Sequence, residues 1–194
     1  EATQYDCVET KEADIRTVQQ YNVIILGGGV YASGIAGLSF LKKNIRALKG
    51  KKIAVFCVGA SPYDEKAIEE GYVHNFKEEL KKIDHDGNVV IASIYGATPD
   101  EFSKLVEDVQ GLVDMIELNI SCPHAMDGYG ASIGQSCDLS HTIVSASKDA
   151  SDVPIIAKLT PNVTDITEIA KTCEDAGADG ISLTLDGQSE SGGK

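Results

Sequence analysis

Three features are scarce in this 194-residue sequence: long apolar runs, basic residues in its second half, and paired cysteines. The longest apolar stretches have the length of a strand and are interrupted by charge or glycine. No segment is therefore predicted to cross a membrane. Glu1 opens a polar segment rather than the charged-then-apolar pattern of a signal peptide, so we expect a cytoplasmic location.

The scarcity of basic residues begins after residue 86. Residues 1–86 carry 13 acidic and 12 basic side chains, whereas residues 87–194 carry 17 and 5, and the net charge of the whole chain is −13. A nucleic acid partner is unexpected because a polyanion needs a basic surface to release its counterions. The change in charge density near Gly87 predicts two segments of different origin.

The five cysteines form no C-x-x-C pair, and their odd number is typical of reduced thiols in a reducing compartment. We expect Cys7, Cys57 and Cys173 to be core residues because they lie in apolar periodic segments.

A zinc site is a weaker alternative. Cys122, His124, Cys137 and His141 could supply two thiols and two imidazoles if their loops meet. The C-x-H spacing is atypical for a structural site, so no metal is predicted. The sequence also has no Ser-His-Asp constellation or nucleophile elbow.

Strand-like and helix-like patterns alternate along the chain, which predicts an α/β fold of about seven βα units with a mostly parallel sheet. Strands are expected near residues 5–9, 22–27, 52–58, 88–94, 114–120, 154–159 and 180–185. Helices are expected near residues 14–19, 36–48, 64–70, 99–110, 139–148 and 165–176. The continuously apolar residues 23–26 and 53–58 are typical of strands covered by helices on both faces. An open doubly wound sheet and a curled barrel share this alternation, and both stay open.

Local signals mark several helix ends. Thr98 followed by Pro99 predicts a helix start, and Asp165 with Glu168 forms a capping-box pattern. Gly177 is predicted to end the last helix.

Hydrophobic periodicity weakens between residues 71 and 87, which we interpret as a junction and expect to be cut first in limited proteolysis. The predicted organisation is a segment 1–79, a junction 80–87, a segment 88–186 and a polar, glycine-rich tail 187–194, forming one continuous fold.

Residues 27–32 read Gly-Gly-Gly-Val-Tyr-Ala after a predicted strand and fit the G-x-G-x-x-A pattern of dinucleotide sites. The next strand, which ends near residues 57–60, lacks the acidic residue that such a site requires. An equal alternative is that the glycines only turn a strand into a helix.

Residues 21–33 and 51–62 resemble flavodoxins with a Gly-Gly-Gly-Val-Tyr-Ala-Ser loop, over about residues 5–79. The resemblance implies an N-terminal flavodoxin-like part whose flavin contacts are Tyr31, Gly59, Ala60 and Ser61. The family's first strand and phosphate loop would precede residue 1.

The apolar residues 113–118 lead into Asn119-Ile120-Ser121-Cys122-Pro123-His124. Parallel α/β enzymes carry their chemistry at the carboxyl ends of strands, where this loop would lie. The motif Glu-Leu-Asn-Ile-Ser-Cys-Pro, together with residues 153–162, resembles the active-site loops of dihydroorotate dehydrogenases. The resemblance covers about residues 88–186 and implies the third to sixth strands of a TIM barrel.

This resemblance assigns roles to five residues. Cys122 matches the base that abstracts a substrate proton, and Asn119, Ser121 and His124 match substrate-binding positions. Lys158 matches the lysine beside the pyrimidine side of the flavin, where a cation stabilises the negative charge of reduced flavin. His124 stands where the family usually has asparagine.

Together, the two resemblances imply an FMN-binding flavoprotein related to dihydroorotate dehydrogenase, an oxidoreductase acting on a CH–CH group of a small-molecule substrate. Leu185-Asp186 replaces the family's Asn-Thr, and the last two barrel strands, whose loops hold the flavin phosphate, are missing. These departures leave open a flavoprotein of this type that has lost its activity. The alternative is a non-enzymatic chimeric α/β scaffold, built from flavodoxin-like and TIM-barrel fragments, that binds flavin weakly or not at all.

Overall fold

A computed structural model describes residues 6–31, 34–35, 37–58, 72–81, 83, 88–121 and 133–183. The strands are β1 (Val23–Tyr31), β2 (Gly34–Ile35), β3 (Lys52–Val58), β4 (Asn88–Ile94), β5 (Met115–Asn119), β6 (Ile155–Leu159) and β7 (Gly180–Leu183). The helices are α1 (Ile15–Val18), α2 (Leu38–Asn44), α4 (Tyr72–Leu80), α5 (Pro99–Val109), α6 (Cys137–Asp149) and α7 (Ile166–Asp175), with short 3₁₀ turns η1 (Gln110–Leu112) and η2 (Ile133–Gln135). The predicted α/β alternation is confirmed, and the helix expected at 64–70 lies outside the described residues.

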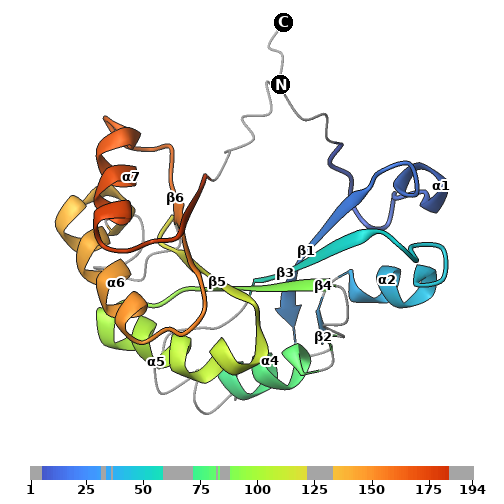
Figure 1. Cartoon of the computed structure of the whole chain (residues 1–194), viewed down its shortest axis with the longest axis horizontal. Helices are drawn as coiled ribbons and strands as arrows, with labels where there is room; N and C mark the ends of the chain where they lie inside the picture. Colours follow the sequence, from blue (N-terminus) through green and yellow to red (C-terminus); the bar gives the residue numbers. More distant parts are fainter. Residues whose placement is uncertain are drawn as a thin grey trace, which may run out of the picture.

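The parallel strands stand side by side in chain order, β1-β3-β4-β5-β6-β7, and β2 forms an antiparallel hairpin with the end of β1. A doubly wound sheet reverses its strand order and carries helices on both faces. Here the order never reverses. The sheet curls to form the inner layer of the molecule, and the helices lie outside it (Figure 1). The fold is therefore a half-barrel of TIM-barrel type. Within the described residues, β7 pairs only with β6.

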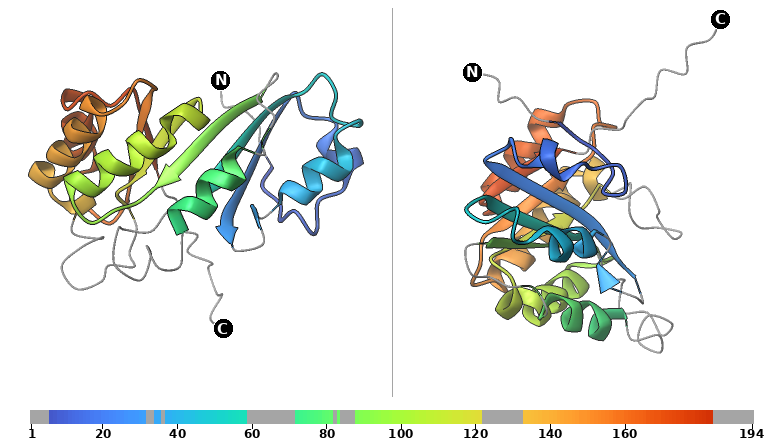
Figure 2. Two further views of the ribbon diagram at one scale, coloured as in Figure 1. Left: turned by 90° about the horizontal axis from the view of Figure 1, so that it is seen from below. Right: turned by 90° about the vertical axis from the view of Figure 1, so that its right-hand side faces the viewer.

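The described helices cover one face of the sheet, as the views in Figure 2 also show. In β1, Leu26 faces the helices and is 6% exposed, whereas Ile25 on the inner face is 71% exposed. The expectation that residues 23–26 are covered on both faces is wrong. Because the described crossover helices return on the same side, none of them reaches the concave face.

The hydrophobic core fills the space between the outer face of the strands and the helices. It includes Val90 and Ile94 of β4, Phe102 and Leu105 of α5, and Ile143 of α6, none more than 1% exposed. Burial of these side chains supplies the main stabilisation of the fold.

The predicted helix ends are confirmed. The Thr98 hydroxyl accepts the N–H of Glu101 at 3.2 Å, and the Asp165 carboxylate accepts the N–H of Thr167 at 2.8 Å. Gly177 follows α7 with φ +99°, a backbone conformation that L side chains rarely adopt.

Two aspartates set strand register in the same way. Asp114, just before β5, donates its N–H to the Val90 carbonyl at 2.9 Å and accepts the Val90 N–H on Oδ2 at 2.8 Å. Asp179, just before β7, makes the same pair of contacts with Ile155, both at 2.8 Å. Each aspartate therefore holds the start of its strand against the neighbouring strand.

The predicted lack of periodicity across residues 71–87 is wrong, because α4 occupies Tyr72–Leu80. Phe76, Leu80 and Ile83 are buried at helical spacing, and the surrounding charged residues obscure this pattern in the sequence. Lys77 of α4 also pairs with Asp108 of α5 at 2.6 Å, which ties α4 to the second half of the chain.

Two further expectations for the N-terminal part are corrected. Residues 6–9 form no strand, and Cys7, predicted to be a core residue, is exposed. Glycines 27–29 do not turn a strand into a helix. They continue β1 and pair in register with residues 56–58 of β3, because residues without side chains can adopt extended backbone as readily as a turn.

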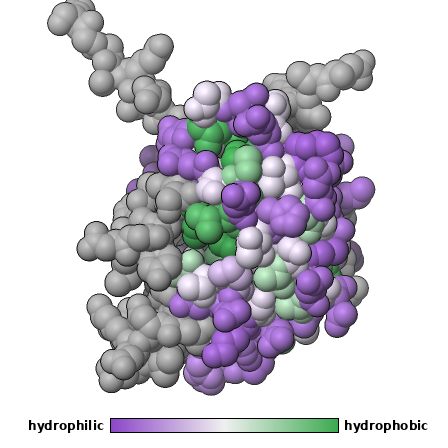
Figure 3. Space-filling view, turned by 90° about the vertical axis from the view of Figure 1, so that its left-hand side faces the viewer, coloured by the Kyte–Doolittle hydropathy of each residue, from purple (hydrophilic) through white to green (hydrophobic). Residues whose placement is uncertain are grey.

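The side of the molecule on which α6 and α7 lie is mainly hydrophilic, with small hydrophobic patches (Figure 3). Among the described residues, no helix is long and apolar enough to span a bilayer.

Candidate functional site

Polar side chains gather on the concave face of the half-barrel, toward the carboxyl ends of the strands. Ser93 of β4 lies in register with Glu117 of β5. Lys158 of β6 lies in register with Asn119 of β5 on one side and with Ser182 of β7 on the other. Because paired residues of parallel strands point to the same face, the sheet brings all five side chains onto its inner face.

Glu117 is the centre of this group. Its Oε1 accepts a hydrogen bond from the Ser93 hydroxyl at 2.7 Å and lies 3.3 Å from Nζ of Lys158. Its Oε2 accepts the hydroxyl of Ser182 at 2.8 Å. The side chain of Glu117 is 3% exposed and that of Lys158 is 19% exposed, so the ion pair is largely withdrawn from water. A carboxylate and an ammonium at such a site each compensate the charge of the other.

Asn119 and Ser121 continue the site beyond the end of β5. The Ser121 hydroxyl donates to Oδ1 of Asn119 at 2.8 Å, and Ser121 is 9% exposed. This bond orients the carboxamide of Asn119, which lies in register with Lys158. The structure therefore brings three of the predicted site residues, Asn119, Ser121 and Lys158, to one end of β5 and β6.

The other predicted site residues are not described to the same extent. Cys122, His124, Gly59, Ala60 and Ser61 lie outside the described residues. Tyr31 is the last residue of β1, and its backbone pairs with Gly34 in the β1–β2 hairpin.

Sequence reasoning assigned no role to Glu117, Ser93 or Ser182. A signal for Glu117 was present, since a single carboxylate interrupts the apolar β5 two residues before Asn119 and must share its face. Ser93 and Ser182 carried no comparable signal, because their relevance depends on which strands neighbour β5 and on the curvature of the sheet.

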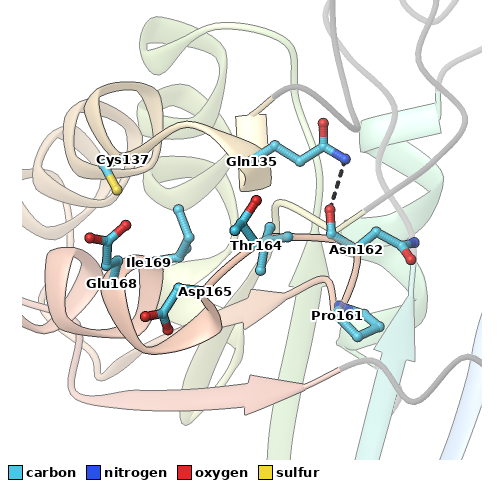
Figure 4. A pocket seen from close by; sticks show the side chains of 9 residues that line it. Gln135, Cys137, Pro161, Asn162, Thr164, Asp165, Glu168 and Ile169 are labelled. Carbon is cyan, nitrogen blue, oxygen red and sulfur yellow. Dashed lines mark hydrogen bonds between the residues drawn. The ribbon is translucent and has the colours of Figure 1, made fainter.

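A separate cavity of about 600 Å³ opens between the start of α6 and the β6–α7 connection (Figure 4). It is lined by Gln135, Cys137, residues 161–165, Glu168 and Ile169. The Gln135 amide bridges its two sides by donating to the Asn162 carbonyl at 3.0 Å. The carboxylates of Asp165 and Glu168 disfavour an anionic ligand here.

Two cysteines lie at the α6–α7 contact. Burial, and next the nearby Cys137, raises the pKa of the Cys173 thiol to about 11, so this thiol stays protonated at neutral pH. Cys137 is the first residue of α6 and shares a helix face with His141 four residues later. The described residues contain no cluster of three or more His, Cys, Asp or Glu side chains suited to a metal ion.

The chain matches two family models. The dihydroorotate dehydrogenase model matches residues 67–190, and the flavodoxin domain model matches residues 1–98. Each match covers at least half of the chain, and the two overlap across α4 and β4.

Several curated relatives are catalytic subunits of dihydroorotate dehydrogenase B (NAD(+)). The Methanothermobacter thermautotrophicus protein is 58% identical over 111 residues, which are 57% of this chain and 36% of that protein. The Methanocella arvoryzae protein is 37% identical over 176 residues, which are 82% of this chain and 56% of that protein. The chain thus spans about a third to a half of the length of these relatives.

A solved structure also overlaps the fold loosely. The carboxyl transferase domain of Rhizobium etli pyruvate carboxylase covers 83% of this chain at a TM-score of 0.49 and 11% identity, with 33% of that chain matched. The sequence matches have much higher identity. The dihydroorotate dehydrogenase match includes β5 and β6, which carry the polar side chains of the inner face. By these matches, the chain belongs to the dihydroorotate dehydrogenase family over residues 67–190 and to the flavodoxin domain family over residues 1–98.

Proposed function

We propose that this chain is an FMN-binding flavoprotein of the dihydroorotate dehydrogenase type, with the flavin at the carboxyl ends of the strands against Lys158. The observation that carries the proposal is the position of Lys158, largely buried on the concave face and beside Asn119. When bound, FMN would supply the acceptor for the electrons removed from a CH–CH group.

The described donors suit the polar edge of an isoalloxazine ring, which presents carbonyl oxygens and ring nitrogens. Lys158 offers an ammonium with three N–H donors, and Asn119 offers the N–H₂ of its carboxamide on the same face. The ammonium would stabilise negative charge on the ring. The strands β1 and β3 run parallel to β6, so Tyr31 and the loop with Gly59, Ala60 and Ser61 would approach the ring from the same edge.

The substrate would be a small molecule such as dihydroorotate, taken between the ring and the loop after β5. Cys122 would hold the role of base, and Asn119, Ser121 and His124 would orient the substrate. A base in this position needs a thiolate, and Lys158 and His124 could supply the field that stabilises it.

Loading with FMN tests the cofactor assignment. The purified protein should take up FMN with a visible flavin band, and Lys158→Met should weaken binding about tenfold, as loss of one charged contact does. Lys171→Met is the matched control, because Lys171 is an exposed lysine of α7, paired with Asp175. Equal affinity in parent and Lys158→Met would contradict the assignment.

Reduction of the bound flavin tests the base. Dihydroorotate should bleach the flavin of the parent, and Cys122→Ala should abolish bleaching without unfolding the chain. Cys122 should also react with iodoacetamide faster than the buried Cys173. Bleaching that survives Cys122→Ala would remove this residue from the reaction.

A non-enzymatic scaffold is the second candidate, in which flavodoxin-like and barrel segments are joined as a chimera with a junction at residues 80–87. The observation that favours it is the match of two different family models, one to residues 1–98 and the other to residues 67–190. Bound flavin that dihydroorotate does not bleach would support this candidate over the enzyme.

A further inference from the structure

We propose that Glu117 is a positioning residue, which holds the ammonium of Lys158 at the flavin-facing end of the concave face. The inference rests on the proposed role of Lys158, and the resemblance assigned Glu117 no role. The carboxylate of Glu117 joins side chains from three other strands, β4, β6 and β7.

Both oxygens of the carboxylate are occupied. Oε1 meets Ser93 at 2.7 Å and Lys158 at 3.3 Å, and Oε2 meets Ser182 at 2.8 Å. Rotation about the last side-chain bond would break at least one of these contacts. The two serines therefore fix the plane of the carboxylate, and the carboxylate in turn presents a fixed oxygen to Lys158.

The register shows why such a restraint matters. Glu117 is in register with Ile156, two residues before Lys158 on β6, so the carboxylate lies one step nearer the amino ends of the strands. A lysine side chain has four flexible carbons and many rotamers in isolation. The contact with Glu117 selects the rotamers that keep Nζ on the inner face, where a ring at the carboxyl ends would meet it.

Neither charge of the ion pair is favourable here without the other. Glu117 is buried and Lys158 is largely so, and an ion withdrawn from water is unfavourable without a counter-charge. Loss of the Glu117 charge should free the ammonium to turn toward solvent. Glu117→Gln keeps the size and removes the charge. Because a carboxamide has one acceptor oxygen, one of the two serine hydroxyls must turn to accept an N–H.

The first test needs no flavin. In the flavin-free protein, the ¹H–¹⁵N ammonium signal of Lys158 is identified by its loss in Lys158→Arg. Glu117→Gln should shift this signal or broaden it beyond detection, because a released ammonium exchanges protons rapidly with water. An unchanged signal in Glu117→Gln would overturn the proposal, whether or not the protein binds FMN.

Two further variants complete this test. Ser182→Ala retains the charge and removes one restraint, so it should shift the signal less than Glu117→Gln does. If Glu117→Gln does not fold, Ser182→Ala takes its place in this test. An unchanged Lys158 signal in Ser182→Ala would then overturn the proposal. Asp108→Asn, which disrupts the Lys77–Asp108 pair between α4 and α5, is the control and should leave the Lys158 signal in place.

The second test is a double-mutant cycle on FMN affinity. Glu117→Gln should weaken FMN binding about tenfold in the parent and have no further effect in Lys158→Met, because the carboxylate acts through the lysine. The same loss in both backgrounds would overturn the positioning role. A parent that binds no FMN would contradict the proposed function, and the ammonium signal would still decide whether Glu117 holds Lys158.

Discussion

Gly134 lies where η2 packs directly on the end of β5. A Cβ built at this position would stand 2.6 Å from the carbonyl oxygen of Ile120, a backbone atom that cannot move without displacing the loop that carries Ser121. Glycine is needed here because a side chain has no room, and not because of backbone conformation, since φ of Gly134 is not in the left-handed region. A residue without a side chain thus helps to hold the candidate site.

Replacement of Gly134 by alanine should therefore destabilise the fold by about 1–3 kcal/mol through overpacking. Urea unfolding followed by circular dichroism measures the change. The control is Gly111→Ala in η1, where a Cβ meets nothing within 4 Å, and its effect should be within about 0.5 kcal/mol. Equal stabilities of the two variants would contradict this interpretation of the contact.

Asp179 combines a structural and an electrostatic role at the start of β7. Hydrogen bonds from the Lys148 ammonium and then from the Ile155 N–H lower the pKa of Asp179 below its usual value of 3.8. Asp179 therefore binds a proton more readily in the unfolded chain than in the folded one. Its ionised carboxylate stabilises the fold at pH values above the unfolded pKa. This stabilisation is lost as the pH falls through the lowered pKa.

Asp179→Asn should flatten the fall of unfolding free energy below pH 4. At pH 7 the loss should stay below about 1 kcal/mol, because the side chains of Lys148 and Asp179 are 36% and 42% exposed. Urea unfolding at several pH values measures both effects. Lys148→Met should flatten the same region, and a slope unchanged in Asp179→Asn would argue against this assignment.

The β1 strand belongs to a sheet that the described helices cover on one face, so its apolar residues are not equally buried. Residues 23–26 alternate between the concave face and the core, although all four are apolar. Pairing with β3 sets this alternation, and the identity of the side chains does not reveal it.

Adjacent positions of β1 should therefore respond differently to the same change. Leu26→Thr should cost about 2–4 kcal/mol because it places a hydroxyl in the core, whereas Ile25→Thr should change stability by less than about 1 kcal/mol. Thermal unfolding of both variants tests this difference. A large loss in Ile25→Thr would mean that the concave face is buried in solution.

Across the whole molecule, the two family segments share one sheet and one core. β3 pairs with β4 across the predicted junction, from Ile53↔Asn88 to Val58↔Ser93. The core cluster runs without a break from Leu26 to Cys173. This continuity favours one cooperative unit over two independent domains.

We therefore expect a single unfolding transition. The chain has seven tyrosines and no tryptophan, so tyrosine fluorescence and far-ultraviolet circular dichroism follow different parts of the molecule. The two signals should give the same urea midpoint and the same slope. Separate midpoints would indicate that the segments on either side of residues 80–87 unfold independently.

Helix starts at Thr98 and Asp165, the stop at Gly177 and most strand positions follow from the sequence because short-range hydrogen bonds and hydrophobic spacing determine them. The helix over Tyr72–Leu80 was missed because its apolar face is narrow and lies among charges. The single covered face of the sheet, and the convergence of Ser93, Glu117, Lys158 and Ser182, were decided by tertiary structure. Both depend on strand order and curvature, which bring together residues up to 89 positions apart in the chain and which no local pattern encodes.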